Sequence, residues 1–292
     1  MSMVELHRLM LRDKARNAAF AQAISRQVQS GDVVVDLGAG TGMLSMMAAR
    51  AGAKRVHAIE AADIFALGKK ITRANGFEKI ITWHHAPSNE IELREKATVL
   101  ISETFGSHPF EECAHEFVRD ARERLGAKNA RRVPSRVRVF VAAAEAPALR
   151  DDWDLFRGPV AGFDLSLLRD VTLSQMYAHE LPAGALLSSP ALLEDVELGD
   201  KTSSRRVRET SVRIARAGTL TQIVQWFELD LGAGVVLSTA PDQPRTHWRQ
   251  LHFPLREATR VKQGDVVRVK MAIDTRVDRP VSVICDVEIR KK

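Results

Sequence analysis

Residues Val33–Leu44 read VVVDLGAGTGML, and this stretch decides the fold. Val33–Leu37 is an apolar, largely β-branched run with one acid, which is typical of a short buried parallel strand. The three glycines of GAGTG then predict a tight turn, and Met43 begins an apolar helix. Met43 also stands where a dinucleotide fingerprint requires its third glycine. Side chains at these glycines would keep a ligand away from the backbone, so the turn is a candidate ligand loop.

Strands and helices alternate downstream of this loop as far as residue 125. A helical pattern over 3–29 precedes the loop, and the predicted elements that follow are Arg55–Glu60, Asp63–Asn75, Ile80–His84, Thr98–Ser102 and Glu112–Leu125. This alternation predicts right-handed βαβ units and a doubly wound parallel sheet. Ligands of such sheets bind beyond the carboxyl ends of the strands, where Glu60, Asn89 and Glu103 are expected to gather. Glu60 lies twenty residues after Gly40, a spacing that suits a carboxylate accepting from ribose hydroxyls.

The pattern changes after Pro134 to short alternating or β-branched runs without long helices between them. These runs are 136–142, 191–197, 211–215, 219–231, 235–238, 249–254, 266–274 and 281–289. They predict an all-β second domain, a barrel or a sandwich. A polar and aromatic insertion at about Leu149–Tyr177 contains Trp153, Phe156 and Phe163, and its length indicates a contact arm with exposed aromatic side chains.

Composition narrows the class of protein. The 292 residues carry a formal net charge of +6, and 45% of them are hydrophobic, as in a soluble globular chain. Two cysteines give no disulfide framework or cysteine-rich metal site, and no apolar run is long enough to span a membrane. Basic and acidic residues are nearly balanced in both halves, so nucleic-acid binding is not indicated. We expect a cytoplasmic protein without metal.

Three further motifs point to a family. GxGxG after an acid-bearing strand resembles the loop of class I S-adenosylmethionine (SAM) methyltransferases. Ser102–Glu112, SETFGSHPFEE, resembles the double-glutamate loop of protein arginine methyltransferases, and Thr246-His247-Trp248 resembles their THW loop. HRLMLRDKAR, from His7, is similar to the HxxMLxDxxR pattern of their N-terminal helix. The resemblance covers nearly the whole chain from His7 onward.

The resemblance implies a two-domain architecture. Residues 1–133 would form an N-terminal helix and a Rossmann-like class I methyltransferase domain that binds SAM. Residues 134–292 would form a β-barrel substrate domain, with a helical dimerisation arm inserted at about 149–177. The expected assembly is a homodimer through this arm.

The resemblance also implies roles for individual side chains. Arg16 would bind the SAM carboxylate with Glu103 beside it, Asp13 would pair with His247, and Met10 would line the methyl-transfer site. The implied cofactor set is Met10, Arg16, Asp36, Gly38, Gly40, Gly42, Leu44, Glu60, Ala61, Ser88, Asn89 and Glu103, with S-adenosylhomocysteine as product. The implied catalytic set is Glu103, Glu112, His247 and Asp13, and the substrate set is Glu103, Glu112, His247 and Trp248.

The chemistry of a guanidine substrate agrees with these roles. A guanidinium is a poor nucleophile because its lone pairs are delocalised and it stays protonated near neutral pH. Two carboxylates, Glu103 and Glu112, would hold its plane and draw positive charge away from the attacking nitrogen. Transfer then makes that nitrogen acidic, so His247 or a carboxylate suffices to accept the proton.

Two departures leave the substrate open. The family's tyrosine-rich YFxxYxx segment has no match before His7, which predicts a pocket that is more open or is covered by the arm or a partner. Thr104, Phe105, Ser107 and His108 replace bulky and aromatic residues in the double-glutamate loop. The predicted activity is methylation of arginine in proteins. The alternatives are methylation of free arginine or another guanidino metabolite, and a catalytically silent SAM-binding dimeric scaffold.

Overall fold

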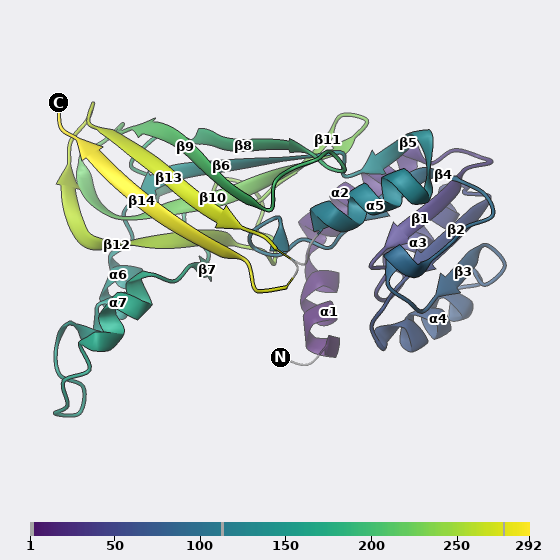
Figure 1. Cartoon of the computed structure of the whole chain (residues 1–292), viewed down its shortest axis with the longest axis horizontal. Helices are drawn as coiled ribbons and strands as arrows, with labels where there is room; N and C mark the ends of the chain where they lie inside the picture. Colours follow the sequence, from purple (N-terminus) through teal and green to yellow (C-terminus); the bar gives the residue numbers. More distant parts are fainter. Residues whose placement is uncertain (1–2, 112–113, 277) are drawn as a thin grey trace. The chain divides into compact units, whose positions relative to one another are not determined.

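The computed structural model describes residues 3–111, 114–276 and 278–292, and it divides into two compact units (Figure 1). Unit 1 comprises Met1–Val137, Val196–Thr202 and Glu228–Ser238. Unit 2 comprises Arg138–Asp195, Ser203–Phe227 and Thr239–Lys292. None of the described helices is long and apolar enough to cross a membrane.

Unit 1 is built on a five-stranded parallel sheet in the order β3-β2-β1-β4-β5. Its elements are α1 (Met3–Arg12), α2 (Lys14–Gln27), β1 (Val33–Leu37), α3 (Met43–Arg50), β2 (Arg55–Ile59), α4 (Ile64–Ala74), β3 (Ile81–His84), η1 (Ser88–Glu90), β4 (Ala97–Ser102), α5 (Ala114–Arg124) and β5 (Gly126–Val133). Every residue of the central strand β1 is buried. The predicted α/β fold of this half is confirmed.

The register of the sheet brings the ends of three strands together. Leu37 of β1 lies opposite Ile59 of β2 on one side and opposite Ser102 of β4 on the other. The residues that directly follow these strands are Gly38 after β1, Glu60 after β2 and Glu103 after β4. Because the strands are parallel, these three residues share the carboxyl edge of the sheet, where such folds bind their ligands.

The structure differs from the sequence expectations at two places in unit 1. The helical pattern over 3–29 is two helices, because Asp13 caps α2 by accepting a hydrogen bond from the Arg16 N–H at 2.9 Å. The edge strand β5 was not expected, since its sequence GAKNARRV is mostly polar. An edge strand has one neighbour and needs little apolar surface, so its pattern is weak.

Unit 2 is an all-β domain with a helical insertion, as predicted. The elements of this half of the chain are β6 (Arg136–Ala144), α6 (Pro147–Trp153), η3 (Leu155–Arg157), α7 (Leu167–Leu173), β7 (Tyr177–His179), η4 (Ala183–Ala185), β8 (Ala191–Glu197), β9 (Arg205–Arg213), β10 (Gly218–Gly232), β11 (Val235–Ser238), β12 (Gln250–Val261), β13 (Val266–Asp274) and β14 (Ser282–Arg290). Of these, β11 and one end each of β6, β8 and β10 belong to unit 1. One sheet has the order β7-β12-β10-β6-β8, with β11 paired to β10, and the other has the order β14-β13-β9.

A buried ion pair links the two sheets of unit 2. Arg206 of β9 donates to the Glu194 carboxylate of β8 at 2.6 and 3.1 Å, and both side chains are less than 5% exposed. A further Arg206 N–H donates to the Thr275 hydroxyl at 3.3 Å. The pair therefore has the additional hydrogen bonds that two desolvated charges need.

The inserted arm is anchored by its base and apolar at its tip. Trp153, expected to be exposed, is instead buried and stacks on Tyr177 with ring centroids 5.4 Å apart. Arg150 holds the base by donating to Asp154 and to the Leu255 carbonyl. Phe163 and Leu167, in contrast, are 70% and 90% exposed.

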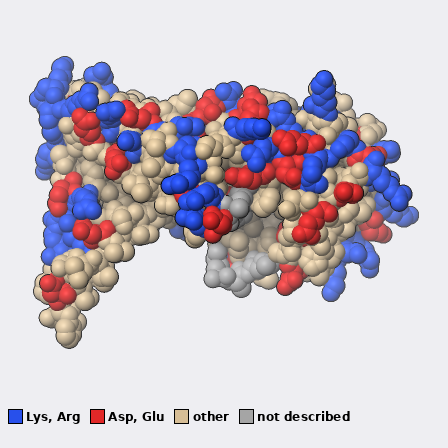
Figure 2. All heavy atoms as spheres, viewed as in Figure 1, with Lys and Arg blue, Asp and Glu red and all other residues tan. Residues whose placement is uncertain are grey.

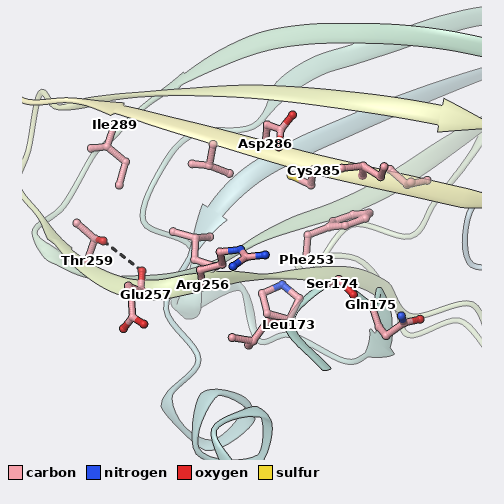
Figure 3. A pocket seen from close by; sticks show the side chains of 15 residues that line it. Leu173, Ser174, Gln175, Phe253, Arg256, Glu257, Thr259, Cys285, Asp286 and Ile289 are labelled. Atoms are coloured by element: carbon pink, nitrogen blue, oxygen red, sulfur yellow. Dashed lines mark hydrogen bonds between the residues drawn. The ribbon is translucent and has the colours of Figure 1, made fainter. Parts of the chain in front are cut away.

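A groove of about 540 Å³ opens between β12 and β14 (Figure 3). Its walls include Phe253, Cys285 and Ile289, and Leu173 of the arm closes one end. None of the residues predicted for the methyl-transfer chemistry lines this groove.

Candidate active site

The glycine loop follows β1 with a backbone that side chains would obstruct. Gly38 and Gly40 have φ values of +67° and +54°, in the left-handed region that favours glycine. A Cβ at Gly38 would lie 2.6 Å from Thr104 Cγ2, and one at Gly40 would lie 2.7 Å from His7 Cε1. Thr104, the residue after Glu103, therefore lies close to the loop at Gly38, and His7 of α1 lies close to it at Gly40.

Glu60 holds the loop against the end of β2. Its carboxylate accepts a hydrogen bond from the Gly40 N–H at 2.9 Å and another from the Ala62 N–H at 2.8 Å. A carboxylate has about four acceptor positions, so two remain for other donors. Glu60 therefore lies at the strand edge with acceptor positions to spare, and its predicted binding of ribose hydroxyls stays a prediction.

Arg16 and Glu103 form a buried ion pair at the same edge. Their side chains are 7% and 4% exposed, and the Arg16 guanidinium donates to Glu103 Oε2. Burial lowers the pKa of Arg16 to about 10, against the opposing effect of Asp13 and Asp36. Arg16 therefore stays charged near neutral pH. Its Nε–H is buried without a hydrogen-bond partner among the described residues.

Asp36 is a buried acid inside β1, two residues before Gly38. The Ser45 hydroxyl donates to its Oδ2 at 2.5 Å, while Oδ1 has no partner in the described part of the chain. Burial raises the pKa of Asp36 to about 7. The site thus contains an orphaned buried acceptor as well as the orphaned donor of Arg16.

A small hollow of about 50 Å³ lies at this edge. Among the predicted cofactor residues, those that line it are Met10, Arg16, Gly38, Gly40, Leu44 and Glu103. His7 of α1 also lines it, is half-buried, and has a pKa lowered by desolvation. His7 was absent from the predicted site, although the HRLMLRDKAR match begins with it. α1 therefore lies against the loop, with His7 next to Gly40.

Other predicted cofactor residues lie outside this hollow. Ser88 and Asn89 form the short η1 turn after β3, and Ala61 is exposed beyond Glu60. Gly42 has a packing reason for lacking a side chain, since a Cβ there would lie 2.7 Å from Thr72 Cγ2. Their roles toward a cofactor stay predictions.

The double-glutamate loop is described only in part. Glu103 lies at the end of β4, while Glu112 lies outside the described residues. Between them Phe105 and Phe110 are buried, and the Glu111 carboxylate accepts from the His108 N–H at 3.3 Å. The described part of this loop therefore has two buried aromatic side chains and one internal hydrogen bond.

The THW loop belongs to unit 2 and precedes β12. Trp248 is 2% exposed and packs edge-on against Phe227, with ring centroids 5.5 Å apart. The His247 ring lies 4.2 Å from the Trp248 ring and is half-buried. Trp248 therefore fills the core and positions its neighbour. The pairing of His247 with Asp13 stays a prediction.

Comparison with known proteins decides the family. A family model described as the arginine methyltransferase oligomerization subdomain matches residues 136–290, more than half of the chain. The chain belongs to the arginine methyltransferase family. A second model, the TRM5/TYW2 methyltransferase domain, matches residues 3–125.

Relatives of this family member match most of its length. It is similar to an arginine N(omega)-methyltransferase of Streptomyces achromogenes subsp. streptozoticus, with 31% identity over 91% of this chain and 75% of the relative. It is also similar to protein arginine N-methyltransferase 1 of Caenorhabditis elegans, with 30% identity over 90% of this chain and 78% of the relative.

Solved structures show the same fold. The Trypanosoma brucei PRMT1 enzyme–prozyme complex with AdoHcy matches with a TM-score of 0.87 at 23% identity, covering 98% of both chains. Arabidopsis thaliana protein arginine methyltransferase 10 matches with a TM-score of 0.85 at 22% identity, covering 98% of this chain and 93% of that one. The predicted family and fold class are confirmed.

The raised pKa of Asp36 predicts a pH-dependent stability. Its folded pKa of about 7 exceeds the unfolded value of 3.8, so the folded state binds the proton more tightly. This contribution is fully present below pH ~4 and is lost as the pH rises through ~7, on the order of 4 kcal/mol at most. Asp36→Asn keeps an acceptor for Ser45 and should remove the loss, as measured by denaturant unfolding between pH 4 and 8.

The matched control is Asp63→Asn, which changes an exposed carboxylate at the start of α4. This variant should keep the pH profile of the unchanged protein. An Asp36→Asn profile that still falls across the same pH range would contradict the assignment.

Proposed function

We propose that this family member transfers a methyl group from SAM to a guanidine nitrogen of arginine. Arginine in a protein is the first candidate substrate. The observation that carries the proposal is the buried Arg16–Glu103 pair beside a glycine loop that backbone geometry keeps free of side chains. The names of the relatives support it, since the Caenorhabditis elegans protein is a protein arginine N-methyltransferase. The Trypanosoma brucei complex, which shares the fold, contains AdoHcy.

The residues at the strand edge fit a SAM-like cofactor. The orphaned Arg16 Nε–H can donate to a carboxylate, and the orphaned Asp36 Oδ1 can accept from an ammonium group. An α-amino acid group carries both charges, so it would satisfy both buried atoms. Glu60 would accept from the ribose hydroxyls with its two remaining acceptor positions. When bound, SAM supplies an electrophilic methyl group.

We propose that α1 shifts when the cofactor binds. A hollow of about 50 Å³ has room for only a few waters, since one water needs ~10–15 Å³ of such volume, and it is too small for a nucleoside joined to an amino acid. His7 is the side chain of α1 that lies next to the loop, since a Cβ at Gly40 would be 2.7 Å from His7 Cε1. Burial lowers the pKa of His7 and so favours its neutral imidazole, which can move into water without carrying a charge.

The residues of this chain then act on the guanidinium. Arg16 occupies Glu103 Oε2, which leaves Oε1 to bind one edge of the substrate guanidinium. Glu112, by its place in the double-glutamate motif, would bind a second edge. Two carboxylates fix the plane of the group and polarise it toward the attacking nitrogen. His247, held by Trp248, would accept the proton released after transfer.

Free arginine is the second candidate substrate. The Streptomyces relative, at 31% identity, is named for arginine without the word protein. The same two carboxylates would bind the guanidinium of the free amino acid, so the contacts at Glu103 do not separate the two substrates.

Methyl transfer from labelled SAM tests the activity and the substrate together. The reaction is run in parallel on an arginine-rich peptide, free arginine and a cell lysate. We expect label in peptide and lysate proteins, and a loss of at least ~100-fold for Glu103→Gln, because a neutral amide cannot bind a guanidinium as an ion pair. The matched control is Glu78→Gln, an exposed glutamate of unit 1, which should keep full activity.

The outcomes separate the candidates. Label only in free arginine would move the protein to metabolite methylation. Absence of label with SAM binding intact would favour the silent scaffold. An active Glu103→Gln variant would contradict the proposed role of the buried pair.

We further propose that the arm mediates a homodimer. The oligomerization subdomain matched over 136–290 supports this assembly. The large apolar side chains exposed on the arm are Leu155, Phe163, Leu165, Leu167, Leu168 and Val171. Isolated exposed apolar residues are ordinary, but a cluster of this size on one insertion marks a contact surface.

Charge at the arm tip should dissociate the dimer. Phe163→Asp with Leu167→Asp would place two carboxylates in an apolar contact, so sedimentation analysis should give the mass of one chain. Leu192→Asp, at a 45% exposed position on β8, is the matched control and should leave a dimer. A dimer in the arm variant would contradict the proposal.

A further inference from the structure

Asp265 organises one end of unit 2, where β9, β13 and β14 meet. Val266, the first residue of β13, lies opposite Arg213 on one side and Arg290 on the other. The Asp265 carboxylate is fully buried and accepts from the backbone N–H groups of Lys262 at 3.0 Å and Lys292 at 2.9 Å. These two bonds lower the pKa of Asp265. The turn and the chain after β14 are therefore held together by one buried charge.

Six exposed cations gather around this turn, and we name them the barrel-end patch. They are Arg213, Arg260, Lys262, Arg290, Lys291 and Lys292. Lys291 donates to the Arg260 carbonyl, and the strand register places the others beside the same turn. Figure 2 shows Lys and Arg side chains gathered over the end of unit 2 where the C-terminus lies in Figure 1.

Most of this charge is not neutralised. Arg290 pairs with Glu288 at 3.1 Å, and Lys291 lies 3.8 Å from Asp265. The other four cations have no carboxylate within 4.0 Å among the described residues. Six cations against two carboxylates leave about four positive charges on one small surface. The near balance of charge over each half of the sequence concealed this concentration.

The patch is concave. A hollow of about 440 Å³ is lined by the unpaired Arg213 and Lys292, by Ser189 and Gln263, and by the backbone from Ile214 to Ala215 and at Gly264. Four of these residues, Ser189, Arg213, Gln263 and Lys292, have side chains that can donate hydrogen bonds. A phosphate group binds well to such a combination of cations and polar hydrogen-bond donors.

Two other anionic partners fit less well. None of the large hydrophobic side chains found exposed in the described residues lies at this turn, so the patch has no apolar group to insert into a membrane. It also has no aromatic side chain on which the bases of a single strand would stack. A duplex presents its phosphates outside and its bases inside, which suits a patch that has cations and no stacking surface.

We propose that the barrel-end patch docks the sugar–phosphate backbone of a double-stranded nucleic acid, independently of its sequence. The cations would replace counterions along the phosphates, which makes the affinity strongly salt-dependent. With four unpaired cations, the slope of log K against log salt is about −3.6. This surface is separate from the methyl-transfer residues and does not depend on the proposed activity.

Binding of a fluorescent 20-base-pair duplex to the full chain tests the proposal, at salt concentrations from ~50 to ~200 mM. Arg213→Gln, Lys262→Gln and Lys292→Gln are combined to remove three unpaired cations. We expect the affinity at the lowest salt to fall ~10–100-fold and the slope to lose about three. The control combines Lys70→Gln, Arg73→Gln and Lys79→Gln, three exposed cations of unit 1 without a carboxylate partner among the described residues.

Each outcome bears on the proposal. Loss in the patch variant with retention in the control supports it, provided both variants melt at the temperature of the unchanged chain. Equal loss in both variants would show that only net charge matters and would overturn it. Tighter binding to vesicles with 20% phosphatidylserine, or to a single strand of the same length, would assign the patch to a different partner.

Discussion

The Arg16–Glu103 ion pair is the interaction on which the candidate site depends. Both groups are almost fully buried, and loss of one partner from such a pair typically costs about 3–5 kcal/mol. The pair joins the first turn of α2 to the end of β4, so the N-terminal helices are bound to the carboxyl edge of the sheet. Asp13 adds the cap that begins α2 at this point.

The parallel register places this ion pair beside the glycine loop and Glu60. Leu37 is opposite both Ile59 and Ser102, so the glycine loop, Glu60 and Glu103 follow at the same level of three adjacent strands. Glu60 then binds the loop backbone, and the loop is held between the ends of β2 and β4. The position of each polar group therefore follows from strand pairing and one buried pair.

The sequence predicted the parts of the structure that depend on a local or periodic pattern of residues. The apolar run before GAGTG predicted the buried β1, and the alternation of strands and helices predicted that the glycine loop, Glu60 and Glu103 share the carboxyl edge of the sheet. The sequence did not predict features whose position depends on residues far away in the chain. The polar edge strand β5 was missed, and Trp153 was expected outside although Tyr177 covers it. His7 against Gly40 and the barrel-end patch likewise arise from residues far apart in the chain.

The loop after β1 is proposed to bind SAM by close approach of its backbone. Calorimetric titration of SAM into the Gly38→Ala variant tests this binding mode. Gly76→Ala is the matched control, because Gly76 has φ +80° but no atom within 4 Å of an added Cβ. Both variants bear the same strained backbone, while only Gly38→Ala places a methyl group 2.6 Å from Thr104 in the loop. We expect the SAM affinity to fall at least ~100-fold in Gly38→Ala and to change little in Gly76→Ala. Equal SAM affinity in the two variants would contradict it.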